Sequence, residues 1–185
     1  MIILVDMDGV LADFVACVCE LFGKDPIRTQ NNWKPGNYDI CPELGVSPEK
    51  LWGKVEEEGE ELWAGLKPYP WARDMYDWLK TQGDVIVLTQ PTLDPGCLSG
   101  KLRWLYEFTG DDKFRDFIMS PRKDAFANED SLLIDDSDKN IEKFKKACPN
   151  AKTILFPQPW NGMHSFRGDK FTHVRHLIHK FLPLQ

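Results

Sequence analysis

The chain has 185 residues, a length that suits one domain with a full hydrophobic core and a small appendage. Hydrophobic residues make up 42% of it and charged residues 28%, as in ordinary soluble globular proteins. The net charge of −6 argues against extended nucleic-acid binding, because such interfaces need many Lys and Arg contacts to phosphates. No stretch has the apolar length of a membrane-spanning helix, so we expect no membrane partner.

The cysteines indicate a reducing compartment. They are odd in number and lack the spacing of a zinc site, which is typical of buried free thiols. The apolar run at the N-terminus meets Asp6 too early for a signal peptide. We therefore expect a cytoplasmic protein, and the sequence leaves its oligomeric state open, a homodimer included.

The first strand-like segment, residues 1–5, is wholly apolar and predicts a strand buried on both faces of a parallel sheet. Asp6 and Asp8 follow it and share one direction, because side chains two apart in a strand lie on the same face. Gly9 permits a sharp turn. An ordinary turn could explain such acids, yet the carboxyl end of a central strand is also where open α/β sheets bind ligands.

Helix and strand patterns alternate regularly from residue 71 onward, which predicts a doubly wound parallel α/β sheet. Residues 15–68 lie outside that alternation and predict a small helical cap, with residues 1–14 and 69–185 as the core. Within the predicted cap, residues 23–48 are expected to be irregular. The predicted elements after the first strand are helices at 14–22, 48–58 and 72–81, a strand at 84–88, a helix at 100–109, strands at 117–119 and 131–134, a helix at 140–147, a strand at 153–156 and a helix at 172–181.

Polar side chains follow four of the predicted strands, and parallel strands bring such ends to one edge of the sheet. Taken singly, each has an ordinary explanation: Asp135 and Asp136 could cap the next helix, and Lys123 could be a surface lysine. Independent turn residues would seldom combine in this order, so the set predicts an active site. In chain order the set is Asp6 and Asp8, Thr89, Lys123, and Asp135 and Asp136.

These residue types suit the hydrolysis of a phosphate monoester. The substrate is a dianion, so a carboxylate nucleophile can approach it only when its charge is neutralised. We expect Mg²⁺ to bind Asp6, Asp135 and Asp8, the last through the backbone around it. Lys123 would neutralise the remaining charge. Asp136 would accept a hydrogen bond near the metal, for example from Lys123.

The two acids after the first strand would divide the chemistry between them. Asp6 would attack phosphorus in line and form an aspartyl-phosphate. Asp8 would protonate the leaving oxygen and then take a proton from the hydrolytic water. Thr89 would donate its hydroxyl hydrogen bond to a phosphoryl oxygen, with backbone N–H groups beside it.

Residues 6–14, DMDGVLADF, resemble the first motif of the haloacid dehalogenase superfamily, and their extension resembles that of the 5'(3')-deoxyribonucleotidases. The likeness is recognisable again at 100–104, 118–123 and 132–136, and fades at 16–61 and after 156. It implies a haloacid dehalogenase-like fold, Mg²⁺ as cofactor and a small-molecule phosphate ester, a deoxynucleotide, as substrate. It implies the same roles for Asp6, Asp8, Thr89, Lys123 and Asp135.

The chain departs from that family pattern at several positions. Gln90 stands where the family usually has Ser; it keeps the backbone donor of the phosphate pocket but exchanges a hydroxyl for an amide. Asp124 stands where a Thr is usual. Trp63 lies where the family carries an aromatic pair beside the base, and Leu62 replaces the other member. The resemblance therefore implies base stacking on Trp63 in a roomier slot.

Other functions stay open at this point. A phosphatase for nucleic-acid 3'-ends, or one for a small metabolite such as a sugar phosphate, would use the same strand-end residues. A catalytically silent domain that binds a nucleotide or a protein is a further alternative. The presence of both Asp6 and Asp8 argues against it, because a binder needs no acid–base carboxylate.

Overall fold

A five-stranded sheet forms the centre of the computed structural model, which describes residues 1–181. The strand order is β3-β2-β1-β4-β5, and every neighbouring pair is parallel, which confirms the predicted α/β fold. The first strand therefore lies in the middle, as its wholly apolar sequence predicts. The strands are β1 (Ile2–Val5), β2 (Asp84–Thr89), β3 (Phe117–Met119), β4 (Ser131–Asp135) and β5 (Lys152–Leu155).

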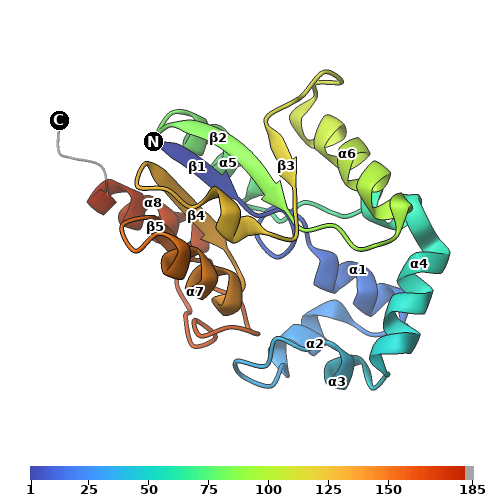
Figure 1. Ribbon diagram of the computed structural model, residues 1–185. Coiled ribbons are helices and arrows are strands. Elements are labelled where there is room, and N and C mark those ends of the chain that lie inside the picture. The colour runs from blue at the N-terminus through green and yellow to red at the C-terminus, as the bar shows by residue number, and fades with distance from the viewer. Residues whose placement is uncertain (182–185) are drawn as a thin grey trace.

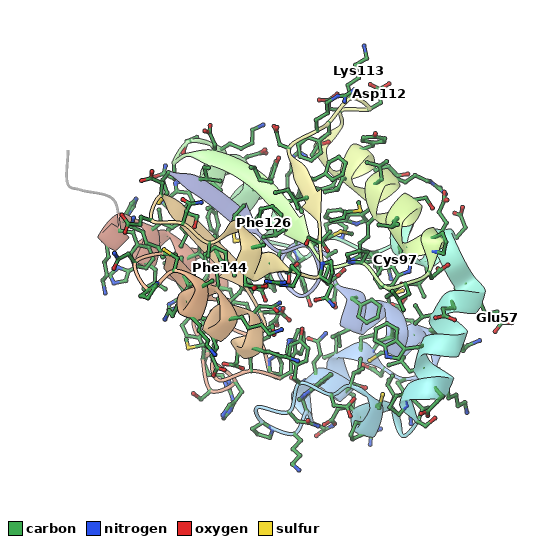
Figure 2. All side chains as sticks on the ribbon, viewed as in Figure 1. Glu57, Cys97, Asp112, Lys113, Phe126 and Phe144 are labelled. Atoms are coloured by element: carbon green, nitrogen blue, oxygen red, sulfur yellow. The ribbon has the colours of Figure 1, made fainter. Side chains whose placement is uncertain are left out.

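Helices cover both faces of this sheet (Figure 1). The side chains of β1 alternate: Ile3 and Val5 join the larger core cluster, to which α5 (Ala72–Lys80) and α8 (Lys170–Phe181) contribute. Leu4 joins a second cluster with Phe144 of α7 (Asp138–Ala147). Phe126 of the short 3₁₀ helix η1 (Lys123–Phe126) packs against this second cluster, and Figure 2 labels both phenylalanines. Both faces of β1 are thus buried.

Four helices lie between β1 and α5: α1 (Phe14–Leu21), α2 (Pro26–Asn31), α3 (Cys41–Leu44) and α4 (Pro48–Ala64). They gather beyond the carboxyl ends of β1 and β2, and α4 lies along α6 (Pro95–Thr109) (Figure 1). The approach of α4 to α6 depends on Gly100, where a Cβ would lie 2.5 Å from the Glu60 carbonyl oxygen. The action of residues 15–68 as a cap stays a prediction.

Contrary to expectation, residues 23–48 are not wholly irregular, because local caps support two short helices. The Asp25 carboxylate accepts a hydrogen bond from the backbone N–H of Arg28 at 2.9 Å, and Pro26 occupies the first turn of α2. Gly45 ends α3 in the left-handed region at φ 72°. Helices this short have no apolar periodicity to read, so only their capping residues could have indicated them.

Helices α4 and α6 extend furthest beyond their predicted bounds. Helix α4 runs to Ala64, although Gly59 interrupts it at φ 58°, next to the predicted end. Helix α6 begins at Pro95 instead of Gly100, since the Asp94 carboxylate accepts from the Gly96 N–H at 3.1 Å. The acidic run at 56–58 faces solvent, and Figure 2 shows Glu57 pointing away from the molecule. No helix within residues 1–181 is long and apolar enough to cross a membrane.

Candidate active site

Strand register brings the polar strand ends to one level. Val5 of β1 pairs with Val87 of β2 and with Ile134 of β4. The next residues, Asp6 and Asp135, therefore lie side by side at the carboxyl ends of β1 and β4, and the Asp6 N–H donates to the Ile134 carbonyl oxygen at 2.9 Å. A buried parallel sheet thus presents both acids at the edge where such folds bind ligands.

Lys123 lies between these two acids and contacts both of them. Its ammonium lies 2.7 Å from Asp6 Oδ2 and 2.7 Å from Asp135 Oδ2, and its side chain is buried. Burial favours the neutral amine, but the carboxylates of Asp135 and Asp6 outweigh it and hold the pKa of Lys123 above its ordinary value. The lysine is therefore a fixed positive charge between two strand ends.

Asp135 is surrounded by donors. Its Oδ1 accepts from the Ser137 N–H at 2.8 Å, and the Asn140 side-chain amide lies 3.1 Å from each of its oxygens. Asn140 lies in the first turn of α7, a position with no signal of its own in the sequence. It fixes the orientation of the Asp135 carboxylate.

Three buried carboxylates, those of Asp6, Asp135 and Asp136, each offer an oxygen within 4.8 Å of the others. One ammonium, that of Lys123, faces them, so the charges of the group do not balance. Burial raises the pKa of Asp6 to about 7, and burial with the nearby Asp135 and Asp6 carboxylates raises that of Asp136. Asp136 Oδ1 is buried and has no hydrogen-bond partner among the described residues. A hard divalent cation fits this donor set and would restore the balance.

The group of three carboxylates includes Asp136. From the sequence we expect Asp136 to lie near the metal without binding it. Contrary to expectation, Asp136 does not accept from Lys123; the indole N–H of Trp160 donates to its Oδ2 at 2.6 Å. The expected binding of the metal by the backbone at Asp8 stays a prediction. The carboxylate of Asp8 lies in a different cluster, around Lys101. The turn after Asp8 requires Gly9, which has φ +74° and whose Cβ would overlap Asp136 Oδ2.

The second cluster forms around Lys101, whose side chain is fully buried. The ammonium donates to the Asp8 carboxylate through Oδ2, to Thr89 Oγ1 at 2.7 Å and to the Gln90 carbonyl oxygen at 3.0 Å. Asp8 Oδ1 is left without a partner among the described residues. The predicted acid–base residue and the predicted phosphate-binding hydroxyl are thus joined by one lysine.

The sequence predicts no role for Lys101 beyond its place in the family-like segment at 100–104. A signal was present: Cys97, Trp104 and Leu105 form the buried face of α6, and Lys101 occupies a position on that same face at helical spacing. A lysine in such a position must pair with a carboxylate or lose its charge. That requirement could have indicated an acidic partner.

The remaining predicted residues lie as follows. The Gln90 side chain is exposed, and only its backbone contacts the cluster. Asp124 pairs with Arg122 at 2.8 Å on the surface.

Trp63 is 3% exposed; its ring stacks on Phe14, with centroids 5.2 Å apart, and Lys101 Nζ lies 5.0 Å from its centroid. Trp52, 41% exposed, stacks on Phe14 at 6.1 Å.

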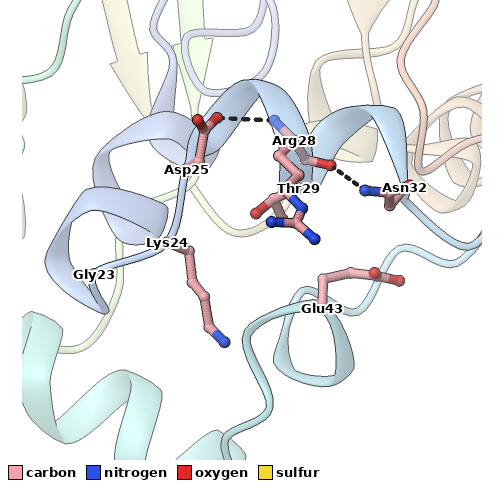
Figure 3. Close-up of a pocket in the computed structure, with 7 residues that line it drawn as sticks. All are labelled: Gly23, Lys24, Asp25, Arg28, Thr29, Asn32 and Glu43. Atoms are coloured by element: carbon pink, nitrogen blue, oxygen red, sulfur yellow. Dashed lines mark hydrogen bonds between the residues drawn. The ribbon is translucent and has the colours of Figure 1, made fainter.

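A hollow of about 570 Å³ lies elsewhere, around α2 and α3 (Figure 3). Its acids already serve the backbone: Asp25 accepts from the Arg28 N–H, and Glu43 accepts from the Lys34 N–H at 3.0 Å. Its side chains do not converge on one point in Figure 3. The strand ends therefore remain the candidate site. The lining residues are Gly23, Lys24, Asp25, Arg28, Thr29, Asn32 and Glu43.

Solved structures share this fold. A hydrolase from Pseudomonas syringae matches with a TM-score of 0.55 at 16% identity, over 97% of this chain and 99% of that chain. A hydrolase from Streptococcus pneumoniae TIGR4 matches with a TM-score of 0.54 at 14% identity, over 96% and 97%. A HAD-superfamily hydrolase, subfamily IA, from Geobacter sulfurreducens PCA matches with a TM-score of 0.51 at 15% identity, over 96% and 95%. At such identities the likeness shows the fold alone.

The family model described as "5' nucleotidase, deoxy (Pyrimidine), cytosolic type C protein" matches residues 1–182. This match covers nearly the whole chain, and it confirms the resemblance to haloacid dehalogenase-like deoxyribonucleotidases that the first motif indicates. The protein is an enzyme, a phosphatase of the nucleotidase type. The chain belongs to the 5' nucleotidase, deoxy (Pyrimidine), cytosolic type C family.

Proposed function

We propose that this protein is a Mg²⁺-dependent phosphomonoesterase that hydrolyses deoxynucleoside monophosphates through an aspartyl-phosphate intermediate. One observation carries the proposal: the two acids after β1 each pair with a buried lysine, Asp6 with Lys123 and Asp8 with Lys101. Buried cations beside a carboxylate nucleophile are what the approach of a phosphate dianion requires. A domain that only binds would not need the second acid.

The residues divide the reaction into two displacements. The Asp6 carboxylate attacks phosphorus, the bond from phosphorus to the sugar oxygen breaks, and Asp8 gives its proton to that oxygen. Asp8, now ionised, takes a proton from water; the water oxygen attacks phosphorus and releases phosphate and free Asp6. Thr89 and Lys123 offer hydrogen-bond donors to phosphoryl oxygens, and Lys101, held by Thr89 and the Gln90 backbone, adds positive charge.

Asp6 and Asp135, with the backbone at Asp8, are the proposed metal ligands, and Asp136 completes the acidic group. When bound, Mg²⁺ supplies positive charge that stabilises the phosphoryl oxygens. The fit rests on the unbalanced charge of the three carboxylates and on the unpartnered Asp136 Oδ1. Lys123 keeps Asp6 and Asp135 together for this purpose.

A deoxynucleotide substrate is supported by the family description, which carries the words "deoxy" and "Pyrimidine". It is also supported by the aromatic column of Trp52, Phe14 and Trp63 beside Lys101. A flat base suits such a column. We propose that residues 15–68 form a helical cap that carries two rings of this column, Trp52 and Trp63, and keeps water from the strand ends.

Phosphate release from a panel of substrates tests the proposal. The panel holds deoxy- and ribonucleoside 5'- and 3'-monophosphates, sugar phosphates and 3'-phosphorylated oligonucleotides, each with Mg²⁺ and with EDTA. We expect Mg²⁺-dependent release, highest for a deoxynucleoside monophosphate. Preference for an oligonucleotide or a sugar phosphate would replace the substrate assignment, and activity undiminished by EDTA would contradict the metal requirement.

A further inference from the structure

The segment after β5 returns to the strand ends and contacts both acidic turns. Gln158, Trp160 and Asn161 are buried although each carries a polar group. The Gln158 amide donates to the Gly9 carbonyl oxygen, and the Asn161 amide donates to the Asp136 carbonyl oxygen at 2.8 Å. The segment therefore ties the turn after Asp8 to the turn after Asp135.

Trp160 makes the contact that reaches a carboxylate. Its indole N–H donates to Asp136 Oδ2 at 2.6 Å, and both side chains are buried. The same oxygen lies so close to Gly9 that a Cβ there would overlap it. Oδ2 is thus held between the indole and the glycine, and Oδ1 is the oxygen left without a partner. A single donor determines which oxygen of Asp136 is available.

The indole of Trp160 is held in place by a residue of the segment at 15–68, Trp33. The ring of Trp33 lies against that of Trp160, with centroids 5.2 Å apart and planes at 52°. Trp33 is buried and donates its own indole N–H to the Asn37 carbonyl oxygen at 2.6 Å. One more contact joins the two segments, from the Gly36 N–H to the Pro159 carbonyl oxygen at 3.3 Å.

We propose that Trp160 is a positioning residue that orients Asp136 toward the bound divalent cation, and that Trp33 holds its indole in place. The inference rests on the proposed Mg²⁺-dependent function. It gives the segment at 15–68 a second role, because the docking of that segment through Trp33 sets the geometry of the acidic group. Partners that orient metal-binding residues typically change metal affinity about 10- to 100-fold when lost.

The test measures Mg²⁺ binding by calorimetry on substrate-free protein, with Mg²⁺ alone as the probe. Trp160→Phe keeps an aromatic ring and removes the N–H, and we expect it to weaken Mg²⁺ binding about tenfold or more. Trp104→Phe is the matched control, because Trp104 is also 3% exposed and its indole N–H donates to a backbone oxygen, that of Leu66, at 2.7 Å. The control should lose a similar buried hydrogen bond without changing Mg²⁺ affinity.

The outcomes separate this inference from the proposed function. Wild-type affinity in Trp160→Phe would overturn the inference alone, and so would equal weakening in both variants. No Mg²⁺ binding by the wild type would overturn the metal requirement and the inference with it. Trp33→Leu should weaken Mg²⁺ binding in the wild-type background and add nothing in the Trp160→Phe background; additive effects would overturn the part assigned to Trp33.

Discussion

The ammonium of Lys101 donates a hydrogen bond to the carboxylate of Asp8, although 93 positions separate the two residues in the chain. The lysine reaches Asp8 from the buried face of α6, and α6 can approach that point because Gly100 allows α4 to pack against it. The packing of two helices therefore sets the environment of the proposed acid–base residue. This coupling makes Lys101 the first residue to test.

Lys101→Met should lower kcat/KM for a phosphate ester by about 10²–10³-fold, the usual effect of losing one donor that stabilises developing charge. Methionine is similar in length and apolar, so it suits the buried site while removing the charge. The Asp8 carboxylate and the Thr89 hydroxyl would lose a shared partner. Steady-state kinetics measures the effect, and thermal unfolding checks that the variant is folded.

Lys67→Met is the control for that variant. Lys67 also pairs with a carboxylate, that of Glu20 at 3.0 Å, but on the surface, where such pairs contribute little to stability. Its kinetics should match the wild type. If Lys101→Met were folded and equally active, Lys101 would have no part in catalysis.

Asp6→Asn should abolish turnover, because an amide cannot attack phosphorus, and it should also change how stability depends on pH. Burial raises the pKa of Asp6 from 3.8 to about 7 in the folded, metal-free protein. Between these pH values the folded protein holds a proton that the unfolded chain has released. The contribution of the Asp6 carboxyl group to the free energy of unfolding is therefore complete below about pH 4, and it is lost as the pH rises to 7.

The Asp6→Asn variant has no such group to titrate. In EDTA, the difference between its Tm and that of the wild type should therefore increase in favour of the variant from pH 4 to pH 7. The full shift corresponds to at most about 4 kcal/mol. Asp112→Asn, at an exposed tip (Figure 2), should show no such change. A Tm difference that stays constant with pH would contradict the raised pKa, and near wild-type turnover in Asp6→Asn would contradict the aspartyl-phosphate.

The strand ends of this site are predictable from sequence because their signals are local. An apolar run followed by a polar residue marks each one, and the parallel pairing of β1 with β4 brings Asp6 and Asp135 together. Lys123 reaches both acids from η1, which follows β3. Lys101 and Trp160 are different. Each meets its carboxylate through packing between distant segments, which periodicity does not encode. The short helices α2 and α3 could not be predicted for a local reason: they have too few residues to show an apolar period.

Metal dependence should follow Asp135 more than Asp136. Asp135→Asn places an amide where Lys123, Ser137 and Asn140 all donate, so donors would face a group that can no longer accept as many bonds. Asp136→Asn keeps an oxygen for the Trp160 indole. We expect both variants to raise the Mg²⁺ concentration for half-maximal activity, with the larger rise for Asp135→Asn. A larger rise for Asp136→Asn would make Asp136 the principal ligand.

The aromatic column tests the substrate. Trp63 is buried between Phe14 and Lys101, so Trp63→Ala removes support from both. Losing support for Lys101 should lower kcat/KM for every phosphate ester. If the column also binds a base, a deoxynucleotide should lose more than a base-free ester, by the about 1–3 kcal/mol that stacking on one base contributes.

The measured quantity is therefore the ratio of kcat/KM for the deoxynucleotide to that for the base-free ester. Trp63→Ala should lower this ratio about 5- to 150-fold, which is the same stacking energy expressed as a rate ratio. Trp52→Ala, which removes the exposed end of the column and does not contact Lys101 through its ring, should lower the ratio while leaving the base-free ester unaffected. An unchanged ratio in both variants would mean that these rings only hold residues 15–68 together and that the base binds elsewhere.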